Sequence, residues 1–274
     1  MAVIWGLDLH DMQWSKFKSS YMWNNEYHLR RTKFIVYQLA MIFCVVSESL
    51  GTAVLSDYRD QQSYIENKTG LNASVYNNDY IGAGSYNIFV GVFVATIFGA
   101  AFFFDLFWPE RYESPAVKLA WRICSVLACI FCLSSAITFT VITACFRAHV
   151  EIRPGSDVTP EQARQLMNEF GKGPLEYHNS PRAVASLVFL WPGFIFTVAS
   201  TVLMWFSIAH DDKFGPKSTH ARESEKGYAS HINGSDDVAV GAGASDAQGS
   251  RLGHAPNYPQ QAHTTGQPPA YEGV

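Results

Sequence analysis

The sequence has little charge and little cysteine. Only 16% of its 274 residues are charged, and the formal net charge is −4. A nucleic-acid-binding protein would carry a dense basic face, so this mild acidity excludes that class of function. An extracellular disulfide framework is excluded as well, because the five cysteines all lie inside or at the end of apolar segments. They are Cys44, Cys124, Cys129, Cys132 and Cys145.

The sequence also lacks the common catalytic motifs. It contains no G-x-S-x-G, no H-E-x-x-H and no phosphate-binding loop, and its nine histidines are scattered. The Cys129 and Cys132 pair has the C-x-x-C spacing, but the second pair that a zinc site needs is missing. We therefore expect no enzymatic activity, no metal and no cofactor.

Four long apolar segments dominate the chain instead. They cover residues 34–56, 86–108, 119–145 and 183–209, and each is long enough to cross a hydrocarbon core of about 30 Å as a helix. The sequence therefore predicts an all-α integral membrane protein with a four-helix transmembrane domain at 34–209, and the lipid bilayer as its first partner. A cytoplasmic arm (1–33) would precede this domain and a disordered cytoplasmic tail (210–274) would follow it.

The distribution of basic residues predicts the orientation. The segment before the first span contains five basic residues. The loop 57–85 contains only two basic residues, together with four acidic ones. The positive-inside rule then places both termini in the cytoplasm and the two longer loops outside. The first 33 residues contain no continuous apolar segment of the signal-peptide type, so the first span would itself direct insertion.

Acceptor sequences for N-glycosylation agree with this orientation. Asn67-Lys68-Thr69 and Asn72-Ala73-Ser74 both fall in the first outer loop, so Asn67 and Asn72 are predicted glycosylation sites. A third sequon begins at Asn233, in the predicted cytoplasmic tail, and should remain unmodified.

Small residues predict how the spans pack. Gly91, Ala95 and Gly99 recur every fourth residue in the second span, and a similar ridge runs along the third. Such ridges allow close helix approach, so we expect the second and third spans to form a tight antiparallel pair, and the Gly91 ridge to support a homo-oligomer. Pro192, followed by Gly193, should kink the fourth span or open a turn.

Glu48 is the only acidic residue well inside a predicted span. A carboxyl group in that position is costly unless it is protonated or paired. Two interpretations remain open. Glu48 is either a proton- or cation-coupled site of a transporter, or a protonated carboxyl bonded to a neighbouring helix.

Two amphipathic segments are predicted outside the spans. Thr159 to Gln162 has the capping-box pattern, and Gly171 ends the helix that this pattern begins. Its apolar side could contact the outer leaflet, the other loop or a partner. In the amino-terminal arm, Trp14, Phe17 and Tyr21 suit either a short helix on the inner leaflet or a disordered arm.

The tail contains the most specific short motif. From about residue 215 the chain has almost no large aliphatic residues, which predicts disorder. Near its end, Pro268, Pro269 and Tyr271 match the P-P-x-Y pattern. This motif resembles the ligands of WW domains, including those of Nedd4-type ubiquitin ligases, and so implies such a ligase as a partner. Lysines on the same arm would then be ubiquitin acceptors.

In topology, residues 34–209 resemble the four-span membrane proteins of the MARVEL type and of the fungal SUR7/PalI type. The resemblance implies a plasma-membrane organiser or a signalling or trafficking accessory. The alternative is a subunit of a small-solute or ion transporter or channel that uses Glu48.

Overall fold

The computed structural model describes residues 3–4 and 7–236 of the chain. The chain divides into two units, residues 1–228 and 229–274, and the first contains all four long apolar helices. Helix α7 (Thr219–Asp236) crosses this division. The predicted tail motif at Pro268, Pro269 and Tyr271 lies outside the described residues.

The four predicted apolar segments form four long helices. These are α2 (Arg30–Lys68), α3 (Asn78–Phe107), α4 (Pro115–Cys145) and α6 (Pro181–Phe214). Each is long and apolar enough, by length and composition, to cross a membrane. The prediction of four helices of this kind is therefore confirmed.

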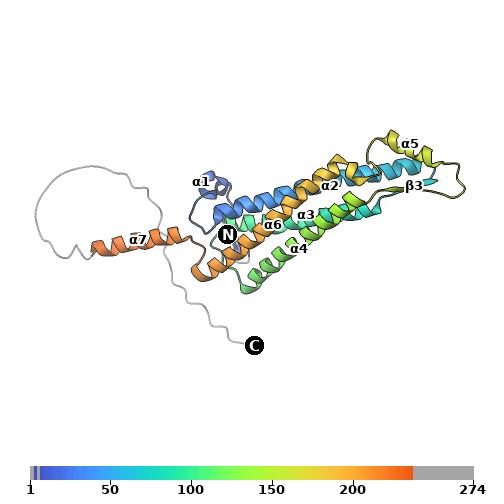
Figure 1. Cartoon of the computed structure of the whole chain (residues 1–274). Coiled ribbons are helices and arrows are strands. Elements are labelled where there is room, and N and C mark those ends of the chain that lie inside the picture. Colours follow the sequence, from blue (N-terminus) through green and yellow to red (C-terminus); the bar gives the residue numbers. More distant parts are fainter. Residues whose placement is uncertain (1–2, 5–6, 237–274) are drawn as a thin grey trace, which may run out of the picture. The chain divides into compact units, whose positions relative to one another are not determined.

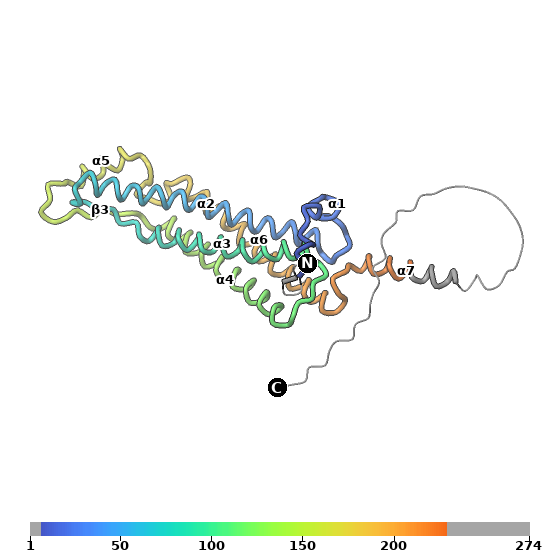
Figure 2. The backbone as a smooth tube through the Cα atoms, turned by 180° about the vertical axis from the view of Figure 1, so that it is seen from behind, coloured from blue at the N-terminus to red at the C-terminus, as the bar shows by residue number. Residues whose placement is uncertain are grey.

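The four helices lie side by side in one bundle (Figures 1 and 2). Helix α2 packs along both α3 and α6, and α4 packs against α3 and α6 on the other side. We call the end of the bundle at which α2 starts and α6 finishes the base, and the opposite end the head. The amino-terminal arm lies at the base, and α5 and β3 lie at the head.

Local sequence explains where α4 and α6 begin. Ser114 and Ser180 are the N-cap residues, and their hydroxyl groups accept hydrogen bonds from Val117 N and Ala183 N. A proline follows each serine at the first helical position, where its missing N–H costs no intrahelical bond. Helix α6 also continues through Pro192, so the turn that we considered there does not open.

The small residues of α3 pack against α2. A Cβ atom added at Gly91 would lie 2.6 Å from Glu48 Oε2, and one at Gly99 would lie 3.3 Å from Met41 Sδ. Glu48 and Met41 both belong to α2, so these glycines face the first span, whereas we expected them to face the third. Because α2 covers Gly91 and Gly99, neither is free to serve a second copy of the chain.

A hydrogen-bonded polar layer joins all four helices inside the bundle. Asn87 of α3 donates to Ser47 Oγ of α2 at 3.4 Å and accepts from Ser135 Oγ of α4 at 3.2 Å. Ser186 of α6 donates to the Ser47 carbonyl oxygen at 2.7 Å. All four side chains are buried, so their polar atoms satisfy one another where water has little access.

The two loops at the head pair with each other. Strand β3 (Ala73–Tyr76) comes from the α2–α3 loop and pairs antiparallel with β4 (His149–Ile152) from the α4–α6 loop, with Val75 opposite Val150. Helix α2 also extends beyond the predicted end of the first span at residue 56 and reaches Lys68. The head is therefore one folded unit built from both loops.

Helix α5 (Pro160–Phe170) lies on the extended part of α2. The predicted capping box is present, with Thr159 and Gln162 bonded reciprocally, and Gly171 ends the helix at a φ of 68°. The Phe170 ring packs 5.3 Å from the Tyr64 ring. Of the surfaces that we considered for its apolar side, the structure thus selects the first outer loop, through α2.

A cluster of buried tyrosines lies in the head. Tyr58, Tyr80 and Tyr177 are buried, with ring centroids 4.9 to 5.4 Å apart. The Tyr177 hydroxyl, in the short helix η3 (Tyr177–Asn179), donates to Asp79 Oδ1 at 2.6 Å. These contacts tie the start of α3 to the segment before α6.

The amino-terminal arm is folded onto the base. Lys16 Nζ donates to the Phe107 carbonyl oxygen at 2.7 Å, and Trp108 Nε1 donates to the Asp8 carbonyl oxygen at 2.9 Å. In its described residues the arm is therefore folded, but as short pieces and not as one helix. They are β1 (Val3–Ile4), β2 (Leu7–Asp8), η1 (Leu9–Asp11), η2 (Trp14–Phe17) and α1 (Ser19–Met22).

Candidate functional site at the base of the bundle

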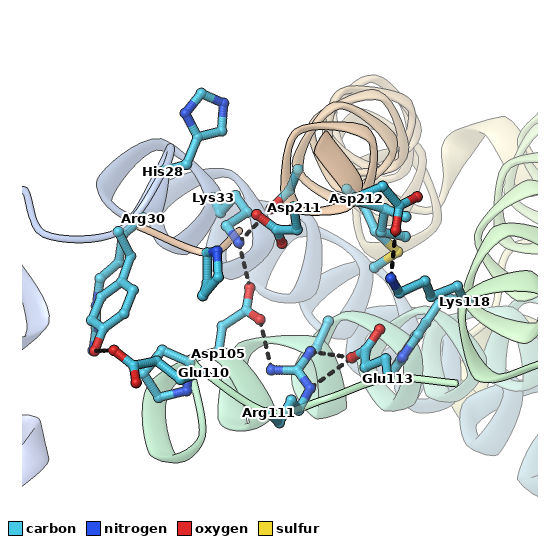
Figure 3. A pocket seen from close by; sticks show the side chains of 18 of the residues that line it. His28, Arg30, Lys33, Asp105, Glu110, Arg111, Glu113, Lys118, Asp211 and Asp212 are labelled. Atoms are coloured by element: carbon cyan, nitrogen blue, oxygen red, sulfur yellow. Dashed lines mark hydrogen bonds and ion pairs between the residues drawn. The ribbon is translucent and has the colours of Figure 1, made fainter. Parts of the chain in front are cut away.

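A cavity of about 410 Å³ opens at the base (Figure 3). The ends of all four long helices line it, together with the arm before α2 and the segment 109–113 between α3 and α4. Tyr37, Ala101 and Met204 form its deeper wall, about one helical turn further into the bundle than the charged residues. Charged side chains thus surround the opening, and mostly apolar ones line the interior.

A chain of ion pairs crosses the cavity. Lys33 Nζ of α2 lies 2.8 Å from Asp105 Oδ2 of α3 and donates to Ser207 Oγ of α6 at 2.9 Å. The other oxygen of Asp105 accepts from Arg111 NH1 at 3.0 Å, and Arg111 NH2 lies 2.6 Å from Glu113 Oε1. Figure 3 shows these contacts as dashed lines. The Asp105 carboxylate therefore links α3 to α2 and to the α3–α4 segment, and Lys33 extends the network to α6.

This ion-pair chain is largely shielded from solvent. The side chains of Lys33, Asp105 and Arg111 are 10%, 19% and 15% exposed. Burial disfavours the charged form of Arg111, but the Asp105 and Glu113 carboxylates outweigh it and raise the pKa of Arg111 above its usual value. The guanidinium therefore stays charged and holds both carboxylates in place.

A second ion pair attaches α4 to α6. Lys118 Nζ contacts Asp212 Oδ1, and Arg122 NH2 lies 3.8 Å from the other oxygen of Asp212. The Asp212 side chain is 43% exposed, so this pair contributes less than the buried one.

The arm and the start of the tail meet beside the cavity. Ser218 N donates to the Glu26 carbonyl oxygen at 2.8 Å, and His28 N donates to the Pro216 carbonyl oxygen at 3.2 Å. The His28 ring stacks on the His210 ring, with centroids 3.7 Å apart and planes 2° from parallel. The segment that follows α6 is therefore held against the amino-terminal arm at residues 216–218.

The electrostatics of this junction keep His28 neutral. Burial is the main cause that lowers the pKa of His28, and the neighbouring His210 and Lys33 lower it further. Tyr27 stays protonated for a related reason, since burial and the carboxylates of Glu26 and Glu110 raise its pKa. Its hydroxyl donates to Glu110 Oε1 at 3.3 Å.

The arrangement at the base is suited to holding segments together. In the described part of the chain, no group of three or more His, Cys, Asp or Glu residues could hold a metal ion. The lysines and arginines of the cavity lining that were described above are paired with carboxylates, so they serve first as cross-links between helices. Arg30, which also lines the cavity, is not paired in this way.

The structure separates the site residues that the sequence predicted. Asn67 is exposed on the last turn of α2, and Asn72 lies half-buried just before β3, so both are at the head. Glu48 and Gly91 are brought together in the middle of the bundle. Ala95 lies on α3 between the two glycines and is half-buried.

Only part of the base cavity was recognisable in the sequence. Lys33 is one of the five basic residues before the first span, which we used only to predict the orientation, and neither Asp105 nor Arg111 was predicted to belong to a site. The signal that points to the cavity is a single acidic residue, Asp105, at the end of an apolar segment, together with basic residues at the ends of the adjoining segments. Because the pairing depends on which helices are neighbours, the sequence alone does not reveal it.

Comparison of the chain with protein-family models, with curated proteins and with solved structures found no match. No family match thus supports the likeness to the MARVEL and SUR7/PalI types, which rests on the four apolar helices.

Proposed function

We propose that this protein is a non-enzymatic four-span membrane protein that acts as an organiser or a signalling and trafficking accessory. In this proposal its bundle anchors a cytoplasmic tail that recruits partners, and its head offers a second contact surface outside. The base faces the cytoplasm, and the protein resides in the plasma membrane.

The observation that carries the proposal is the junction between residues 25–28 and 216–218. Three hydrogen bonds hold it: the two backbone bonds described above, which form the antiparallel bridge between Tyr27 and Lys217, and the Ser218 Oγ bond to the Asn25 carbonyl oxygen at 2.7 Å. A tail that starts from a fixed point on a membrane anchor is suited to presenting a binding motif beside the bilayer. Pro268, Pro269 and Tyr271 supply such a motif for a WW-domain ubiquitin ligase.

Proximity labelling from the carboxyl terminus in intact cells tests this function. Tyr271→Ala should remove WW-domain proteins from the labelled set. Tyr258→Ala, which changes a tyrosine of the same tail outside the motif, is the matched control and should leave the set unchanged. An identical set for the Tyr271→Ala chain and the unaltered chain would contradict recruitment by this motif.

A transporter or channel subunit is the second candidate. Among the described residues, the Glu48 carboxylate has no ion-pair or hydrogen-bond partner, although Glu48 lies within an apolar span. Transport activity that is lost in Glu48→Gln at unchanged surface abundance would favour this candidate, and unaltered activity of the variant would favour the organiser.

A further inference from the structure

A second cavity, of about 390 Å³, lies at the start of α2. Two arginines and two histidines line it, namely Arg30, Arg31, His28 and His220. The other lining residues are neutral, so no carboxylate is among the side chains that form this cavity in the described part of the chain. The two arginines therefore give the cavity lining a positive charge, which would attract an anion.

Arg30 is the distinctive residue of this cavity. It is only 2% exposed, yet none of its three guanidinium nitrogens has a hydrogen-bond acceptor among the described residues. The guanidinium carbon lies 4.6 Å from the centre of the Tyr21 ring and 5.0 Å from that of Tyr27. These rings stabilise the cation in part, but they leave the N–H groups unbonded. A buried guanidinium without an acceptor is the group that an incoming anion would satisfy.

The backbone adds further donors at the same place. Helix α2 is 39 residues long, and its N-cap residue, Leu29, makes no side-chain capping bond. The N–H groups of Arg30, Arg31 and Thr32 therefore have no partner within the helix, and these three residues line the cavity. The partial positive charge of the helix start favours an anion at this point.

We propose that this cavity binds a phosphate group, either the headgroup phosphate of an anionic membrane lipid or a free phosphate. An arginine fork combined with backbone N–H groups suits the several acceptor oxygens of a phosphate. The apolar run of α2 begins at Phe34, about 6 Å along the helix from Arg30, so in a membrane the cavity lies level with the headgroup layer.

The purified full chain in phosphatidylcholine nanodiscs provides the test. One arm adds inorganic phosphate, with chloride at equal ionic strength as the reference, and the other replaces part of the phosphatidylcholine with phosphatidic acid. We expect at least one addition to raise the unfolding temperature. A response in the second arm alone assigns the site to a lipid headgroup, and a response in the first arm alone assigns it to a free phosphate.

Variants establish whether the cavity is responsible. Arg30→Gln should weaken the apparent affinity at least about tenfold, because it removes the charged donor fork. If the loss of Arg30 prevents folding, Arg31→Gln carries the test, since Arg31 is exposed and its removal should also weaken binding. Arg122→Gln, at the base but outside the cavity lining, is the matched control and should respond like the unaltered chain.

Two results overturn the proposal. One is an unaltered chain whose unfolding temperature rises in neither arm. The other is an apparent affinity of Arg31→Gln equal to that of the unaltered chain. Neither result bears on recruitment by the tail, because the test uses no tail-binding protein.

Discussion

The carboxylate of Glu48 lies over Gly91, so that a Cβ atom at residue 91 would be 2.6 Å from Glu48 Oε2 and 3.0 Å from Glu48 Cβ. The sequence had singled out both residues for separate reasons, one as an intramembrane acid and the other as part of a small-residue ridge. Their contact gives the glycine a specific purpose, which is to leave room for a side chain of α2.

Gly91→Ala should therefore destabilise the bundle by about 1 to 3 kcal/mol, the usual cost of overpacking. The added methyl group would push Glu48 and α2 away from α3. Gly82→Ala is the matched control on the same helix, because a Cβ atom at residue 82 has no atom within 4 Å. Thermal unfolding of both variants in detergent measures the difference, and equal losses would contradict the close contact at Gly91.

Asp105→Asn should be strongly destabilising, by about 3 kcal/mol or more. The change would leave Lys33 and Arg111 charged and largely buried without their shared carboxylate. Asp212→Asn, which breaks the exposed pair with Lys118, should cost much less. The two unfolding curves are compared at neutral pH, and a larger loss for Asp212→Asn would contradict the role assigned to Asp105.

The junction at His28 should weaken in mild acid. Its folded-state pKa is lowered below the ordinary 6.5, chiefly by burial and next by His210, so the unfolded arm binds a proton more readily than the folded arm. The stabilisation by neutral His28 is thus present above about pH 6.5 and is lost as the pH falls through the folded-state pKa. Amide hydrogen exchange at residues 25–28 should accelerate on acidification.

His28→Gln separates this effect from general acid destabilisation. The variant should show a smaller change in exchange at residues 25–28 between about pH 7.5 and about pH 5.5. His178→Gln, which removes a histidine from the head, serves as the control and should keep the full change. An undiminished change in His28→Gln would assign the acid sensitivity to another group.

The tyrosine cluster of the head offers a pair of matched changes. Tyr177→Phe removes the hydrogen bond to Asp79 and should cost about 1 to 2 kcal/mol. Tyr80→Phe should be neutral or slightly stabilising, because the buried Tyr80 hydroxyl has no partner within the described residues. Unfolding measurements that rank the two variants in the opposite order would contradict these assignments.

Glycosylation tests which end of the bundle lies outside. Asn67→Gln or Asn72→Gln should increase the electrophoretic mobility of the chain expressed in eukaryotic cells, because both residues belong to the head. Asn233→Gln should leave the mobility unchanged. A mobility change for Asn233→Gln alone would reverse the proposed orientation.

The fold could be predicted where local signals were strong. Uninterrupted apolar runs identified the four long helices, and the capping box at Thr159 identified α5. The extension of α2 was missed because Asp57 and Arg59 end the apolar run. Yet Val54, Tyr58, Gln61 and Ile65 are buried at helical spacing, and that periodicity was a readable signal.

The contacts between distant segments could not be predicted. Strands β3 and β4 have four residues each and come from different loops, so neither strand has a local partner. The pairing of Lys33, Asp105 and Arg111 likewise depends on the order of helices around the bundle. The sequence supplies the charges, but only the packed structure decides which of them meet.

The polar layer fixes how far each helix is shifted along the bundle axis relative to its neighbours. Its members are Ser47, Asn87, Ser135 and Ser186. Since each helix contributes one member, sliding any helix by a single turn, about 5.4 Å, would break bonds to its neighbours at once. A piston-like displacement of one span is therefore disfavoured. We therefore expect the four helices to move as one rigid body, so that a partner that displaces the head would tilt or rotate the whole bundle, including the base.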